Sequence, residues 1–258
     1  MLIDSHCHLD RLDFDALGGD LDHVLQTARQ QGVEQLLSVC VNLETFPAVL
    51  SIAEQYPFVY ASVGVHPDER ECHEPTVDEL IVLAQHPKIV AIGETGLDYF
   101  HCKGDVAWQQ ERFRTHIRAA LRVGKPLIVH SREAKADTVR ILREEGAERV
   151  GGVMHCFTED WEMAQAALAL NFYISFSGIV TFNSAHTLRD VAARVPLDRM
   201  LVETDSPYLA PVPKRGKTNQ PAYVRHVAER IAGVRKIPLS SVEEATSENF
   251  MRLFNISC

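Results

Sequence analysis

Long hydrophobic runs are absent from this sequence of 258 residues. No window approaches the roughly 18 to 20 uninterrupted apolar residues that a helix needs to span a bilayer. The first residues, MLIDSHCHLD, carry acids and histidines where a secretory signal peptide would carry Lys or Arg followed by an apolar run. We therefore expect a cytoplasmic protein with no membrane partner.

Cysteine is sparse and irregularly placed. The sequence has no CxxC motif and no repeating interval among its six cysteines, which are Cys7, Cys40, Cys72, Cys102, Cys156 and Cys258. A chain of this length with 46% hydrophobic residues can bury a large core and needs no disulfides to stabilise it. We expect reduced thiols, most of them structural.

Basic residues are outnumbered by acidic ones. With 26 Lys and Arg against 35 Asp and Glu, the formal net charge is −9. Non-specific binding along duplex DNA relies on many Lys and Arg that neutralise phosphates and release counterions. The composition therefore disfavours a broad basic surface that coats DNA, while it allows local capture of a few phosphates.

Low-complexity linkers, charge blocks and shifts in composition are also absent. Eight short, almost continuously apolar runs are typical of parallel strands buried on both faces, and they begin near residues 2, 36, 58, 88, 126, 151, 172 and 199. Stretches with helical spacing lie between them. The average step of about 28 residues is the size of one βα unit. The pattern predicts an α/β protein, a single (β/α)8 TIM-barrel domain over residues 1–258.

An H-x-H pair stands at the end of the first expected strand. Alternate residues of a strand face the same side, so His6 and His8 should both point inward while Cys7 points toward the helix layer. Two neutral imidazoles on one side of a strand end suit a transition-metal site.

Four more residues of ligand type fall at the carboxyl ends of expected strands, where barrel active sites are built. Glu94 and His130 close the fourth and fifth strands, His155 nearly closes the sixth, and Asp205 closes the eighth. Six ligands exceed the needs of one tetrahedral ion. We therefore expect two divalent cations, one bound by His6, His8 and Asp205, the other by His130 and His155, with Glu94 bridging them.

Such a pair of ions predicts hydrolysis, because it lowers the pKa of a shared water and polarises the group under attack. Asp205 is the candidate for shuttling the proton of that water, and Glu94 joins it as a catalytic residue through its bridging position. One layer deeper on the same faces, Asp4 and Glu203 are expected to orient ligand histidines.

Three polar residues stand in loops beyond the strand ends, and each allows two interpretations. His66, in GVHPDE, could contact substrate or cap a turn. Arg132 could hold a phosphate in a bidentate manner or form a solvated salt bridge. Asp98 could fix the loop after the fourth strand or bind substrate.

The segment 207–221 is expected to be a long loop after the eighth strand, either functional or simply an ordered surface loop. It contains the one dense basic cluster of a rim loop, Lys214, Arg215 and Lys217, close to Asn219. We expect substrate contacts from His66, Arg132, Arg215 and Asn219.

Several of these segments, taken in order, resemble a known family. DSHCHLD, VGVHP, IGETGLDY, VHSREA, HCF, YISFSG and ETDSPYLAPVP are similar to the TatD family of metal-dependent deoxyribonucleases, and most closely to its YcfH-type branch. The similarity runs from Met1 to about residue 222, and it departs from the family pattern at HCKG after GETGLDYF and at TEDW after HCF.

The resemblance implies a barrel of the metal-dependent hydrolase superfamily, with two metals on the six ligands named above. It also implies hydrolysis of DNA phosphodiesters, with 3′–5′ exonuclease character on single-stranded or terminal nucleotides and usually with added Mg²⁺. Four imidazoles favour Zn²⁺, Mn²⁺, Co²⁺ or Ni²⁺ over Mg²⁺, so activity with Mg²⁺ or Mn²⁺ is compatible with Zn²⁺ in a structure.

Two other functions stay open at this point. One is a barrel hydrolase that acts on another ester, a lactone, an amide or a phosphotriester, although many such enzymes bridge their metals with a carboxylated lysine where this chain has Glu94. The other is a non-catalytic metal-binding interaction protein, which an open coordination position would argue against. The oligomeric state is also open, with a monomer among the possibilities.

Overall fold

The strands of the protein follow one another in a single sheet. The computed structural model describes residues 1–256, and its sheet has the strand order β1-β2-β3-β4-β5-β6-β7-β8. In chain order, these strands are Leu2–Cys7, Val33–Ser38, Val59–Val63, Ile89–Asp98, Leu127–Arg132, Gly152–Met154, Phe172–Phe176 and Met200–Val202. Neighbours such as β4 and β5 pair in parallel. Eight strands in chain order are the arrangement that the regular βα spacing predicts.

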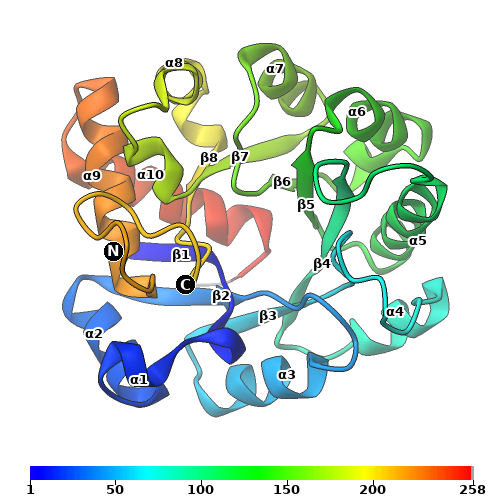
Figure 1. Ribbon diagram of the computed structural model, residues 1–258, viewed down its shortest axis with the longest axis horizontal. Coiled ribbons are helices and arrows are strands. Elements are labelled where there is room, and N and C mark those ends of the chain that lie inside the picture. Colours follow the sequence, from blue (N-terminus) through cyan, green and yellow to red (C-terminus); the bar gives the residue numbers. More distant parts are fainter. Residues whose placement is uncertain (257–258) are drawn as a thin grey trace. The chain divides into compact units, whose positions relative to one another are not determined.

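Helices connect the strands along the chain (Figure 1). They are α1 (Phe14–Leu17), α2 (Leu21–Gln30), α3 (Phe46–Gln55), α4 (Val77–Leu83), α5 (Ala107–Val123), α6 (Lys135–Glu144), α7 (Trp161–Ala169), α8 (His186–Arg194), α9 (Val224–Arg235) and α10 (Leu239–Leu253). Local sequence sets several of their ends. Thr76 and Glu79 form a capping box that starts α4, and Gly124 ends α5 in the left-handed conformation at φ 68°.

The chain forms two compact units. One consists of Met1–Ser38, Cys156–Trp161 and Ile174–Cys258, and the other of Val39–His155 and Glu162–Tyr173. The first buries large side chains such as Phe176 and Phe250, and the second buries Phe113 and Phe172. The single domain expected over residues 1–258 stays a prediction.

Three strands that carry expected site residues, β4, β5 and β8, differ from their expected ends. β5 does not end at His130 but continues to Arg132. β4 does not end at Glu94 but continues to Asp98, with a register shift between Ile92 and Thr95. Gly93 sits inside this irregular stretch at φ 144°, and a Cβ there would lie 2.6 Å from the Ile128 carbonyl oxygen, so no other residue fits.

β8 is shorter than expected, because it ends at Val202 and leaves Asp205 in the following segment. Asp205 therefore does not close β8, and strand alternation does not fix where its side chain points. The backbone still bonds to β1, since the Asp205 N–H donates to the His6 carbonyl and the His8 N–H donates to the Ser206 carbonyl. These bonds, rather than strand alternation, place Asp205 beside the end of β1.

The structure also describes the state of the cysteines and the length of the apolar helices. Cys7, Cys40, Cys72, Cys102 and Cys156 are free cysteines, while Cys258 lies outside the described residues. Within residues 1–256, no helix has both the length and the apolar character required to cross a membrane.

Candidate metal centre

The first unit brings three possible ligand atoms together at the end of β1 and beyond β8. The Nε2 atoms of His6 and His8 lie 3.3 Å apart, and Asp205 Oδ1 lies 3.7 Å from the first and 3.4 Å from the second. Asp205 has φ 56°, a left-handed conformation that is costly for a residue with a Cβ. Two imidazole nitrogens and a carboxylate that converge on one point are a donor set suited to a divalent transition metal.

The carboxylate of Asp4 supports this group through the backbone. Asp4 is fully buried and accepts hydrogen bonds from the backbone N–H and the hydroxyl of Thr204, at 2.8 and 2.6 Å, and from the backbone N–H of His6 at 3.4 Å. Burial raises its pKa to about 8, although the bonds from Thr204 oppose this. The expected contact between Asp4 and a ligand imidazole is not among these bonds, so Asp4 positions the chain that carries the ligands instead.

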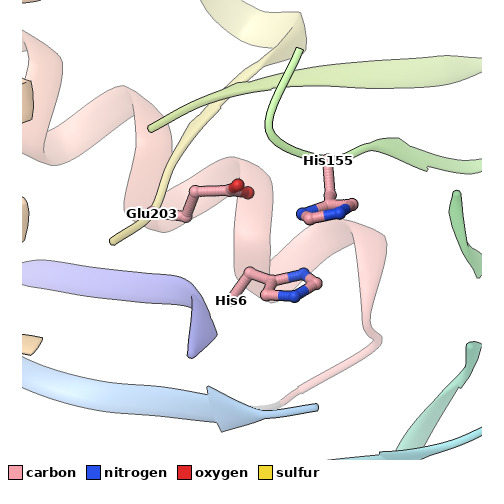
Figure 2. A group of neighbouring side chains, drawn as sticks. All are labelled: His6, His155 and Glu203. Atoms are coloured by element: carbon pink, nitrogen blue, oxygen red, sulfur yellow. The ribbon is translucent and has the colours of Figure 1, made fainter. Parts of the chain in front are cut away.

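Glu203 follows directly on β8 and is also completely buried. Its Oε1 accepts a hydrogen bond from the backbone N–H of Cys156 at 2.7 Å. Possible ligand atoms of Glu203 and His6 lie within 4.8 Å of each other, and Figure 2 shows both side chains, together with His155 just after β6. Glu203 therefore lies next to the first donor set, and its orientation of a ligand histidine stays a prediction.

In the second unit, three imidazoles surround the carboxylate of Glu94. Glu94 Oε1 lies 2.7 Å from His155 Nε2, 3.3 Å from His130 Nδ1 and 3.3 Å from His66 Nε2. The irregular register of β4 at Gly93 and Glu94 aims this side chain, and Glu94 is buried. The structure thus brings together three of the predicted ligands and adds His66, which was expected only to touch substrate.

A second carboxylate orients His130. The Nε2 atom of His130 lies 3.0 Å from Asp98 Oδ2, so Nε2–H donates to that carboxylate. Hydrogen bonds from His130 and His101 overcome burial and hold the pKa of Asp98 well below its usual range. Burial lowers the pKa of His130, but its bonds to Asp98 and Glu94 raise it overall. Asp98 is therefore a positioning residue for His130.

His66 carries the opposite arrangement of its ring proton. Its Nδ1 accepts a hydrogen bond from the backbone N–H of Asp68 at 3.0 Å. A neutral imidazole has one N–H, so the proton of His66 is on Nε2, where it donates toward Glu94. This side chain therefore caps a turn, one of the two interpretations that its sequence context allowed, while its contact with substrate stays a prediction.

Residues of α5 hold the loops that carry His66 and Asp98, and the sequence analysis missed them. Gln109 accepts a hydrogen bond from the backbone N–H of Asp98 at 3.0 Å. Arg112 donates to the carbonyl of His66 at 2.9 Å. His116 accepts from the backbone N–H that precedes His66 at 2.9 Å. The three polar residues stand at i, i+3 and i+7, the spacing of one helix face, which was the available signal.

The expected substrate residues have different environments. Arg132 is exposed, with Cζ 3.9 Å from the ring centre of Phe100. Arg215 is exposed in the same way, with Cζ 3.8 Å from the ring centre of Phe182. Both guanidinium groups are available to a ligand.

Asn219 requires a correction. Its side chain is completely buried, and its Nδ2 donates to the carbonyls of Thr204 and Tyr208 at 2.9 and 2.5 Å. Its Oδ1 accepts from the backbone N–H of Gln220. A side chain without exposed surface cannot contact substrate in this conformation, so Asn219 stabilises the 207–221 loop instead of binding substrate.

The eight-stranded sheet and these two donor sets define a metal-dependent hydrolase of the α/β barrel class. Comparison with known proteins agrees. The model of the family described as TatD related DNase matches residues 3–255. This chain belongs to that TatD-related DNase family.

Three relatives illustrate the relationship. YcfH of Escherichia coli K12, described as an uncharacterized metal-dependent hydrolase, is 50% identical over 256 residues, which are 99% of this chain and 96% of the relative. The 3′-5′ ssDNA/RNA exonuclease TatD of Edwardsiella piscicida is 34% identical over 93% of this chain and 95% of its own. The crystal structure of YJJV, a TatD homolog from Escherichia coli K12, matches with a TM-score of 0.88 and 31% identity over 99% of this chain and 98% of that one. The predicted barrel class is thereby confirmed.

Proposed function

We propose that this hydrolase cleaves phosphodiester bonds of DNA and removes nucleotides from the 3′ ends of single strands. The observation that carries the proposal is Arg132, an exposed guanidinium two residues after His130 that has no ion pair or hydrogen bond from its side chain to any of residues 1–256. An unpaired guanidinium beside a metal ligand suits a substrate that bears phosphate. A neutral lactone or amide would not use it. The name of the Edwardsiella relative supports the same polarity.

We infer that two divalent ions serve the reaction. The donor sets fit them, because His6, His8 and Asp205 converge within 4.8 Å, and His130 and His155 both approach Glu94. Divalent ions at these residues would supply an acidified water and a polarised phosphoryl oxygen. Mg²⁺ or Mn²⁺ is proposed for activity, and Zn²⁺ for a structure. The bridging role of Glu94 and a cytoplasmic location stay predictions.

The side chains themselves would handle protons and charge. Asp205, partly open to solvent, accepts the proton of the attacking water as its oxygen bonds to phosphorus. The bond from phosphorus to the 3′ oxygen of the preceding nucleotide breaks, and that oxygen takes up a proton. His66, with its proton on Nε2, is a donor on this side of the site. Arg132 and Arg215 each bind a phosphate of the strand.

The decisive experiment uses 3′- and 5′-labelled single-stranded oligonucleotides with Mg²⁺, Mn²⁺ or Zn²⁺ in separate reactions. We expect stepwise loss of the 3′ label that depends on metal, and a loss of at least about 100-fold in Glu94→Gln, which removes the charge at the centre of three imidazoles. Arg143→Ala is the matched control, because Arg143 is exposed on α6. If no metal supports cleavage that Glu94→Gln lacks, the proposal fails, and lactones and phosphotriesters become the substrates to test.

A further inference from the structure

Phe100 leaves an aromatic ring exposed directly beyond β4. It is 44% exposed, and among residues 1–256 Phe100 and Tyr208 are the two aromatic side chains of the exposed class. Both follow the carboxyl end of a strand, β4 and β8 respectively, where the loops of a barrel enzyme carry function. A single exposed apolar side chain needs no explanation in itself, so the argument depends on what surrounds this ring.

Three neighbours lie against the Phe100 ring, and the most distant of them is Lys103, whose Nζ is 5.7 Å from the ring centre. The Arg132 guanidinium lies with Cζ 3.9 Å from the ring centre, and the His101 ring meets it edge to face, with centroids 4.8 Å apart and an interplanar angle of 89°. His101 is itself fixed, because its Nδ1 lies 3.0 Å from both Asp68 Oδ2 and Asp98 Oδ2. The ring is therefore braced in an exposed position instead of folding onto the surface.

The guanidinium on this ring lacks an acidic partner. By contrast, Lys103 and Glu133, which are close to Phe100 and Arg132 in the sequence, form an ion pair with each other at 3.3 Å. Arginines of the adjacent helix α5 are also paired, as Arg118 is with Glu145. Arg132 has only the phenyl ring, so its N–H groups face solvent without a bonded acceptor in the part of the chain that the structure describes.

We propose that Phe100 and Arg132 form a nucleotide subsite, in which the phenyl ring stacks on a nucleobase and the guanidinium binds the adjoining phosphate. The inference rests on the proposed nuclease function and adds a residue to which no role was given. Every base has a flat π-face, so aromatic stacking suits a single strand of any sequence. A guanidinium supported by an aromatic ring supplies the fixed fork of donors that a phosphate accepts.

The test uses oligonucleotides that carry one abasic residue at each of the last four 3′ positions in turn. Wild type should cleave one of these substrates roughly 5- to 150-fold more slowly than the intact strand, which is the worth of one stacked base. Phe100→Leu should abolish the difference by slowing the intact strand, whereas Phe100→Trp should retain it. Val82→Ala is the control, because Val82 is also an exposed apolar side chain but lies on α4.

Arg132 gives an independent readout. Arg132→Ala should weaken binding of intact and abasic strands alike, and it should reduce the slope of log affinity against log salt by about 1, as expected for one lost phosphate contact. Arg143→Ala should leave that slope unchanged. Binding is measured by fluorescence anisotropy in the Glu94→Gln background, so this readout does not require turnover.

The outcomes separate the subsite from the proposed function. If wild type cleaves all abasic strands as fast as the intact strand, or if Phe100→Leu keeps the wild-type discrimination, the subsite is refuted while the nuclease function stands. If no strand is cleaved with any metal, the nuclease function is refuted. The anisotropy data then decide the subsite alone, because equal affinity for intact and abasic strands would overturn it.

Discussion

The buried histidine of α5 should make the stability of the protein depend on pH. His116 is completely buried; its Nδ1–H donates to the Arg112 carbonyl at 2.8 Å, and its Nε2 accepts from the Val65 N–H at 2.9 Å. This pair of bonds requires the neutral ring, because a protonated ring has no lone pair for Val65. Burial lowers the pKa of His116 from the ordinary 6.5 to about 4.

The sign follows from this lowered pKa. Above pH 6.5 the ring is neutral in both the folded and unfolded chains, so the stabilising contribution is fully present. As the pH falls below 6.5, His116 becomes protonated in the unfolded chain, whereas in the folded chain it stays neutral until about pH 4. A shift of this size corresponds to a full loss of about 3 kcal/mol, of which about 2 kcal/mol is lost between pH 7.5 and pH 5.

Urea unfolding at pH 7.5 and pH 5 measures this loss in wild type and in His116→Gln. Gln retains an acceptor for the Val65 N–H but does not titrate. Between pH 7.5 and pH 5, the unfolding free energy of His116→Gln should therefore fall by about 2 kcal/mol less than that of wild type. His23→Gln, on the exposed side of α2, should behave like wild type. An equal drop in wild type and His116→Gln would refute the assignment.

Two further predictions concern positioning residues. Asp98→Asn should lower metal affinity about 10- to 100-fold in chelator competition, because His130 loses the charged acceptor of its Nε2 proton; affinity equal to wild type would contradict that role. Asn219→Ala should lower the unfolding free energy by about 1 to 3 kcal/mol, because the buried carbonyl of Thr204 and the partly buried carbonyl of Tyr208 lose their donor. Wild-type stability combined with a raised KM would instead favour the substrate role first expected of Asn219.

Regular spacing and residue type account for what could be predicted of the fold and the ligands. The eight strands lie where apolar runs recur at the length of a βα unit, and His6, His8, Glu94, His130 and His155 all stand in or next to them. Parallel strands bring their carboxyl ends to one edge, so position in the strand was enough to select these candidates. The same reasoning failed for strand ends, because backbone bonding, not residue type, decides where β4 and β8 stop.

The partners of individual side chains could not be predicted in this way. The sequence left Asp98 with two possible roles, fixing a loop or binding substrate. Its contact with His130, 32 residues away, identifies it as a positioning residue. Asn219 had the composition of a polar loop residue, yet the turn of the chain after β8 buries it completely. Such assignments depend on which distant segments of the chain come into contact, and a local sequence pattern does not specify those contacts.

The sequence by itself therefore determined the barrel class and selected six candidate ligands, because both rest on periodicity and residue type along the chain. Only the tertiary structure decided which of these side chains contact one another and which ring nitrogens carry protons. It placed three imidazoles around Glu94 and fixed the ring protons of His130 and His66 through Asp98 and the backbone of Asp68. The physical reason is that a hydrogen bond or a ring contact is a property of two residues in space, whereas a sequence pattern is a property of neighbours along one chain.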